Sequence, residues 1–329
     1  MSVNIYLPPE FTAHADLGSP APSTLTTQGV DAQVVIPGQL HASLWWRTVP
    51  LVNGEKLGVI GHFRAAPTAD ISSVTALLDA ACRKLKDAGC TLAVGPMDGN
   101  TWRSYRFLTW RGDEPRFAFE PDQADVWPTW WQQSGFSAYE QYWSAVVTQL
   151  DAHDVRLDAA IQRLTRAGVT IREIDLAAFE ADLTHIYAVS EIAFRDNVLY
   201  TPLPQAEFLA MYRQVQPLLR PGLSFIAERA GKPVGFVFAL PDLEQAKRGV
   251  PIDTVVVKTL AVLPSRELAG LGKVLLERCQ HAAFAAGFRR AIHALMHAGN
   301  ASLNLGDDAR EIRRYTLFAP GPIPIRPDS

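Results

Sequence analysis

Two glycines in a strand-to-helix turn are the residues of this chain best suited to hold a phosphate. Gly270 and Gly272 lie in VKTLAVLPSRELAGLGKV, where an apolar strand meets a proline, a short loop and a helical pattern. The first N–H groups of a helix lack partners, and its dipole adds positive charge there. Glycines let the amides of residues 267–273 approach a pyrophosphate, with Lys273 at the rim. The same spacing also suits close packing of a helix on a strand, so the pattern alone leaves both interpretations open.

Other motifs with known chemistry are absent from the sequence. His293 and His297 are four residues apart on a predicted strand, roughly 13 Å, which is too far to bind one ion. The sequence has no zinc spacing, no GxSxG and no HExxH, so no metal cofactor is predicted. Cys82, Cys90 and Cys279 lack a CxxC partner, which favours reduced cysteines in a cytoplasmic protein.

Composition narrows the classes of partner. The chain has 329 residues, of which 48% are apolar, and a net charge of −3. This balance gives no electrostatic reason to expect nucleic acid or an anionic membrane as the main partner. No apolar run approaches the roughly 18 to 20 residues that span a bilayer. The start, MSVNIYLPPEF, lacks the pattern of a signal peptide, so we expect a cytoplasmic protein.

The pattern along the chain predicts strands mixed with helices, in an α/β or α+β layered fold. Residues 1–38 are rich in Pro, Ser and Thr and predict an irregular arm. Asn53-Gly54 predicts a hairpin between strands 41–49 and 56–65. The remaining predicted strands are 91–97, 138–150, 169–174, 223–228, 234–240, 257–262, 289–296 and 313–318, and the predicted helices are 72–88, 154–167, 177–194, 204–219 and 275–286.

The two halves of the chain share a register that indicates a tandem duplication. Subtracting 198 from the apolar positions of the helix ended by Gly287 gives those of the helix ended by Gly89. Each helix precedes a strand and then an asparagine, Asn100 or Asn300. The predicted domains are the arm 1–38, a first module 39–150 and a second module 151–329.

The order of elements, the run LAVLPSRELAGLGKVLL and the later Asn300-Ala-Ser resemble the GNAT N-acetyltransferase superfamily. In that family a Q/R-x-x-G-x-G/A loop opening a helix binds the pyrophosphate of acetyl-CoA. Gly270 and Gly272 match its small positions, whereas Glu267 stands at the Q/R position. In the first module Ser72 and Val74 replace the glycines, so the resemblance implies a degenerate copy there. The resemblance implies acetyl-CoA contacts at Leu260, Ala261, Val262, Glu267, Leu268, Ala269, Gly270, Leu271, Gly272, Lys273, Asn300 and Ser302.

The resemblance also implies catalytic and acceptor residues, each with an ordinary structural alternative. His297 is the candidate base, and a hydrogen-bonded structural histidine is the alternative. Tyr315 is the nearest substitute for the family's tyrosine that donates a proton to the departing thiolate, and the alternative is a half-buried strand tyrosine. Asp196 and Tyr200 lie in the connection between two helices that shapes the acceptor pocket in this family, and they could contact a cationic amine there. The alternative is that they are solvated loop residues. An aromatic group including Tyr142 could stack an aromatic or cationic acceptor, but packing between halves or in a homodimer is the preferred interpretation.

The leading hypothesis is an acetyl-CoA-dependent N-acetyltransferase acting on a small-molecule amine or an amino-acid-like acceptor. In such an enzyme the amine would attack the thioester directly in a ternary complex. Two alternatives stay open: a non-catalytic acyl-CoA-binding or regulatory module, favoured by Glu267, and a scaffold for dimerisation.

Overall fold

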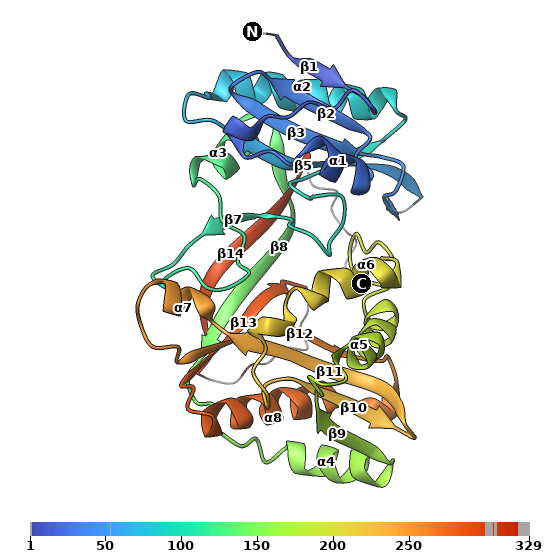
Figure 1. The fold of residues 1–329 in the computed structure, drawn as a ribbon, viewed down its shortest axis with the longest axis vertical. Coiled ribbons are helices and arrows are strands. Elements are labelled where there is room, and N and C mark those ends of the chain that lie inside the picture. Colours follow the sequence, from blue (N-terminus) through green and yellow to red (C-terminus); the bar gives the residue numbers. More distant parts are fainter. Residues whose placement is uncertain (1, 53, 300–304, 306–307, 322–329) are drawn as a thin grey trace.

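The structure is a computed structural model that describes residues 2–52, 54–299, 305 and 308–321. Each half of the chain is built around its own sheet, and two long strands connect the halves (Figure 1). The expected α/β architecture, with mixed sheets flanked by helices, is confirmed. Among the described residues, no helix has the length and apolar content needed to cross a bilayer.

The N-terminal half forms a six-stranded sheet in the order β1-β2-β3-β5-β4, with β6 parallel to β5. Apolar side chains of α2 pack on one face of this sheet and those near α1 on the other. The elements in chain order are β1 (Asn4–Tyr6), η1 (Ala15–Leu17), α1 (Pro22–Thr27), β2 (Ala32–Ile36), β3 (Leu40–Trp45), β4 (Leu51–Val52), β5 (Glu55–Ala65), α2 (Ile71–Asp87), β6 (Leu92–Val94), β7 (Phe107–Trp110), α3 (Val126–Gln133) and β8 (Phe136–Val147).

The C-terminal half forms an eight-stranded sheet in the order β7-β14-β8-β13-β12-β11-β10-β9. Alternate residues of β11 enter two cores, Val237 under α8 and Phe236 under α5. This strand is continuously apolar because helices cover both faces. The elements are α4 (Leu157–Arg166), β9 (Val169–Glu173), α5 (Phe179–Ala193), α6 (Gln205–Arg213), η2 (Gln216–Leu218), β10 (Phe225–Arg229), β11 (Lys232–Pro241), α7 (Leu243–Lys247), β12 (Thr254–Val262), η3 (Arg266–Leu268), α8 (Leu271–Ala285), β13 (Arg290–His297) and β14 (Arg310–Pro320).

The expected repeat is present as two strand–helix–strand units, β5-α2-β6 and β12-α8-β13. In each unit the flanking strands are parallel, as a crossover through a helix requires. Gly89 and Gly287 end the helices in the left-handed region, with φ of 83° and 96°. The periodic apolar face and the glycine stop are therefore sufficient to predict both helices.

The expectation of an irregular arm over residues 1–38 is wrong. Every residue of β2 is buried, and β2 pairs with both β1 and β3. The short run AQVVI supplies a central strand, although Pro, Ser and Thr dominate the preceding residues. The composition of the surrounding sequence does not predict this strand, because strands that pair with it in the sheet bury it, and not the residues next to it in the chain.

The two halves exchange strands, which the predicted division at residue 150 does not anticipate. The last strand of the first half, β8, inserts between β13 and β14 of the eight-stranded sheet. In return β14 runs toward the N-terminal half, where Phe318 exchanges backbone hydrogen bonds with Gly95 (Figure 1). Residues from the first half therefore reach the interior of the second.

Candidate functional site

The start of α8 offers backbone amides without a side-chain cap. Its N-cap is Gly270, and the first hydrogen bond within the helix runs from the Val274 N–H to the Gly270 carbonyl. The N–H groups of Leu271, Gly272 and Lys273 precede that bond, so helix geometry leaves them without a partner in the first turn. Such a cluster of N–H groups, with the helix dipole behind it, binds anions.

Glycine occupies positions 270 and 272 of the loop for different structural reasons. Gly270 has a φ of +84°, and a Cβ there would lie 3.1 Å from that of Ala160, so the protein itself requires glycine. At Gly272 the backbone is not left-handed, and a Cβ would meet only Val262 and Leu260, at 3.8 and 3.9 Å. Close packing of strand and helix therefore does not require Gly272, which favours a ligand near it.

Charged side chains surround the loop. Glu267 pairs with Arg229 on β10, and its side chain is 63% exposed. Arg163 on α4 donates to the Ala269 carbonyl and so ties the loop to α4. Lys273 lies in the first turn of α8. The carboxylate at the family's Q/R position is thus neutralised by a neighbouring arginine, which leaves the backbone amides unopposed.

The matching site in the N-terminal half is closed. Asp70 caps α2 in a reciprocal capping box with Ser73, so side chains already occupy those amides. Further along, a Cβ on Gly61 would lie 2.0 Å from the Met97 carbonyl oxygen, because the Met97 N–H donates to Ile60 and fills the space beside β5. The first module therefore lacks both the anion site and a groove leading from it.

In the C-terminal half the corresponding groove is open. Parallel pairing of β12 with β13 ends at Val257 and His293, although β12 continues to Val262 and β13 to His297. Beyond this point no described strand pairs with the β12 edge that faces β13. An extended ligand arm can pair with that edge as an added strand does.

A cavity of about 1210 Å³ follows this groove from the glycine loop into the space between the halves. The C-terminal half lines it through the loop, β12, β13 and the connection between α5 and α6. The N-terminal half lines it through residues 101–106 and 119–121 and through Tyr142 on the exchanged strand β8. From the predicted sites, the lining includes Leu260, Ala261, Val262, Leu268, Gly270, Gly272, Lys273, Asp196, Tyr200 and His297.

His297 stands at the far end of the groove with a carboxylate partner. Its Nε2 lies 2.8 Å from Glu140 on β8, and the Gly299 N–H donates to its Nδ1 at 3.1 Å. These partners favour the tautomer that donates from Nε2 to the carboxylate and accepts at Nδ1. A histidine held this way can take a proton at Nδ1 once the Gly299 contact opens.

Tyr315 lies behind the cavity and is fully buried. Its hydroxyl is 3.1 Å from that of Ser144 and 3.4 Å from a Glu120 oxygen, and burial raises the pKa of the phenol. Its predicted role as thiolate donor gains no support from this position.

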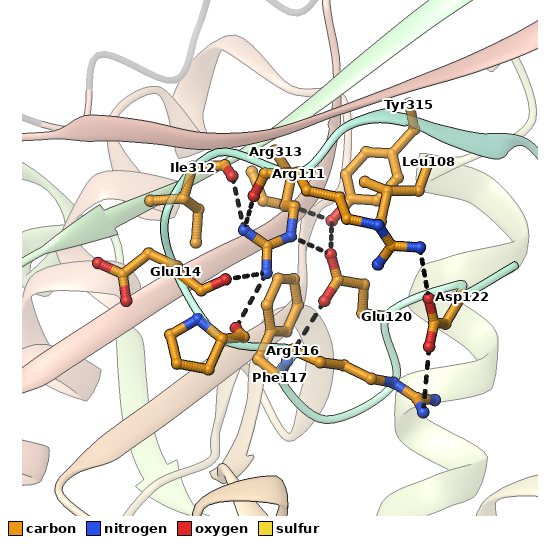
Figure 2. A network of polar contacts seen from close by, with 12 residues as sticks. Leu108, Arg111, Glu114, Arg116, Phe117, Glu120, Asp122, Ile312, Arg313 and Tyr315 are labelled. Atoms are coloured by element: carbon orange, nitrogen blue, oxygen red, sulfur yellow. Dashed lines mark hydrogen bonds and ion pairs between the residues drawn. The ribbon is translucent and has the colours of Figure 1, made fainter. Parts of the chain in front are cut away.

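A buried arginine holds the cavity segment of the first half against β14. Figure 2 shows Arg313 between Glu120 and the main-chain carbonyls of residues 111 and 114, and its guanidinium also donates to the carbonyl of residue 115. The side chains of this ion pair are 2% and 0% exposed. The pair positions Phe119 and Glu120 in the cavity lining.

The comparisons with known proteins agree with this geometry. Residues 186–305 match the model of the acetyltransferase (GNAT) family. This stretch of the chain is similar to the GNAT acetyltransferases. The family and the fold support acyl-CoA-dependent N-acyl transfer as the general chemistry of the site.

Distant relatives are found among curated proteins and among solved structures. Over 56% of its length the chain is 21% identical to the bacterial ceramide synthase of Caulobacter vibrioides and 25% identical to protein YghO of Escherichia coli. It covers 49% and 48% of them, and so spans about half the length of these curated relatives. A structure from Enterococcus faecalis V583, described as a probable N-acyltransferase, shares the fold with a TM-score of 0.53 at 12% identity, over 91% of this chain and 63% of that one.

Several residues of the cavity were not predicted from the sequence. Arg106, Lys258 and Tyr142 line it, and Glu140 supports His297. Lys258 lies in the run VKTLAVLPSRELAGLGKV and Tyr142 in the predicted aromatic group, but neither pattern assigns its residue to the cavity, and only the strand exchange brings the first-half residues to the site. Asn300 and Ser302 lie outside the described residues, and their predicted contacts stay predictions, as do those of Glu267, Ala269 and Leu271, which are not among the cavity-lining residues.

Proposed function

We propose that the protein is an acetyl-CoA-dependent N-acetyltransferase that modifies a small-molecule amine or an amino-acid-like acceptor. The observation that carries this proposal is the uncapped start of α8, with a glycine at position 272 that the protein's own packing does not require. It opens into the groove between β12 and β13, and the groove ends beside His297.

The residues of the site suggest how the transfer would proceed. His297 takes the proton of the acceptor ammonium at Nδ1, while Glu140 holds the opposite nitrogen and stabilises the imidazolium. The free amine attacks the thioester carbonyl, the C–N bond forms, and the C–S bond breaks. As the C–S bond breaks, the nitrogen gives up its second proton to the departing thiolate, directly or through solvent, and His297 then releases the first proton to solvent. The cavity holds both reactants in one geometry.

Turnover across a panel of amines tests the proposal. The full chain is incubated with acetyl-CoA and each amine, free thiol is measured colorimetrically, and the amide is measured by mass spectrometry. We expect one mole of amide for each mole of thiol released. A donor series up to long-chain acyl-CoA accompanies the panel, because one relative is named a ceramide synthase.

The non-catalytic alternative has an observation in its favour, since Gly299 and Glu140 already engage both ring nitrogens of His297. Binding of acyl-CoA without thioester cleavage for any amine in the panel would support that acyl-CoA-binding module instead.

A further inference from the structure

We propose that the acceptor also carries an anionic group, a carboxylate or a phosphate, which Arg106 and Lys258 bind in the deep part of the cavity. This inference rests on the proposed function and deepens it by naming the chemical class of the acceptor. One cation comes from each half of the chain, so the specificity site forms only where the halves meet.

Arg106 is buried without a carboxylate partner among the described residues. It is 6% exposed, and its guanidinium carbon lies 3.8 and 4.0 Å from the ring centres of Tyr105 and Tyr142. Nη1 donates to the Leu295 carbonyl at 3.3 Å, whereas Nε has no hydrogen-bond partner among the described residues. The two rings are perpendicular with their centres 5.6 Å apart, so they flank the ion on adjacent sides and leave its other sides open to an anion.

Lys258 is the second cation of the cavity that has no carboxylate partner among the described residues. It is the extra residue at the register shift where β12 passes β11, which sets it apart from the regular alternation of the strand. Its Nζ lies 5.0 Å from the ring centre of Phe119, and within the described part of the chain no carboxylate lies within ion-pair distance. Burial, and then the charge of Arg106, lower the pKa of the Lys258 ammonium.

Three other charged groups around the cavity are already paired, and Asp196 and Lys273 also line it. Arg103 bonds Glu207 at 2.6 Å, Glu120 pairs with Arg313, and the Glu140 carboxylate receives His297. Two cations left unpaired in a partly dry space are costly unless an anion enters with the substrate. An acidic group on the acceptor supplies that anion and orients the amine relative to His297.

Binding and turnover of matched amines test this assignment. The probes are β-alanine, O-phosphoethanolamine and ethanolamine, which lacks an anionic group, and they are titrated calorimetrically into the full chain saturated with CoA. We expect at least one anionic probe to bind about tenfold tighter than ethanolamine, as a charge-assisted contact implies. The preferred probe identifies carboxylate or phosphate as the anion.

Two variants assign the preference to residues. Lys258→Met keeps the side-chain length and should reduce the anion preference about tenfold. Because it removes an unpaired, partly buried charge, it should also raise the thermal unfolding midpoint, which shows that the loss is not misfolding. Lys86→Met, on the exposed face of α2, removes the same charge far from the cavity and should keep the preference.

The results separate this inference from the proposed function. Anion preference in binding without turnover of any amine would refute the proposed function and keep the anion site. Turnover or binding without preference among the three probes would overturn the anion site. If Lys258→Met lost the same share of turnover for amines with and without an anionic group, that result would also overturn the anion site, because the lysine would then act on the thioester.

Discussion

Substitution of Gly272 separates the two interpretations of the glycine loop. A Cβ at this position makes only ordinary contacts, at 3.8 and 3.9 Å, and the backbone suits any L-residue. Gly272→Ala should therefore raise the free energy of unfolding by about 0.4 to 1 kcal/mol, because alanine restricts the unfolded chain and favours the helix. If strand–helix packing required the glycine, the same change would destabilise the protein.

Gly272→Val introduces at α8 the residue that Val74 supplies in the first module. Its two methyl groups stand beside the amides that would hold the pyrophosphate and keep its oxygens from them. Loss of a charge-assisted hydrogen bond costs about 2 kcal/mol, so acetyl-CoA should bind roughly 30-fold more weakly. Gly272→Ala adds no branch and should keep binding within about threefold.

Urea denaturation gives the stabilities of both variants, and calorimetric titration of acetyl-CoA gives their affinities. Ser72→Val, at the position matching Gly270 in the degenerate copy, is the control for a bulky residue in a first helical turn and should leave affinity unchanged. Wild-type affinity in Gly272→Val would refute the reasoning, since no phosphate could then lie over this residue. Destabilisation by Gly272→Ala would favour the packing interpretation.

Three further predictions follow from buried charges and the candidate base. Arg313→Met should lower the free energy of unfolding by about 3 to 5 kcal/mol in urea melts, because Glu120 is left buried and unpaired, and adding Glu120→Gln should restore part of it. Burial lowers the pKa of His41 to about 4, so the unfolded state takes up the proton first and the free energy of unfolding should fall as the pH drops from about 6.5 to 4. His41→Asn should flatten that pH dependence in urea melts, and an unchanged slope would contradict the prediction. His297→Gln should lower kcat about 100-fold or more with little change in acetyl-CoA affinity, and a smaller effect than that of Glu140→Gln would argue against the base assignment.

Local sequence patterns predict the parts of the fold that depend on local physics. The apolar faces of α2 and α8 and their glycine stops are determined by neighbours in the chain. The glycine loop is predictable for the same reason, since a turn and the following helix lie within one short segment.

The rest depends on contacts between distant segments. No local signal says that β8 pairs with β13 instead of closing its own sheet, because both choices bury the same alternating residues. Arg106 and Lys258 are ordinary isolated cations in the sequence, and their meeting in one cavity follows only from the way the halves fit together. Tyr315 was assigned from its position in the chain, whereas its packing against Ser144 decides where its hydroxyl points.

The central claim is that the start of α8 binds the pyrophosphate of acetyl-CoA. A calorimetric titration of acetyl-CoA into wild type, Gly272→Asp and Ser72→Asp tests it most directly, because aspartate in the first turn of a helix keeps the fold while repelling an anion. The account predicts that wild type and Ser72→Asp bind with equal affinity and that Gly272→Asp shows no measurable binding. Equal binding by all three proteins would contradict the claim.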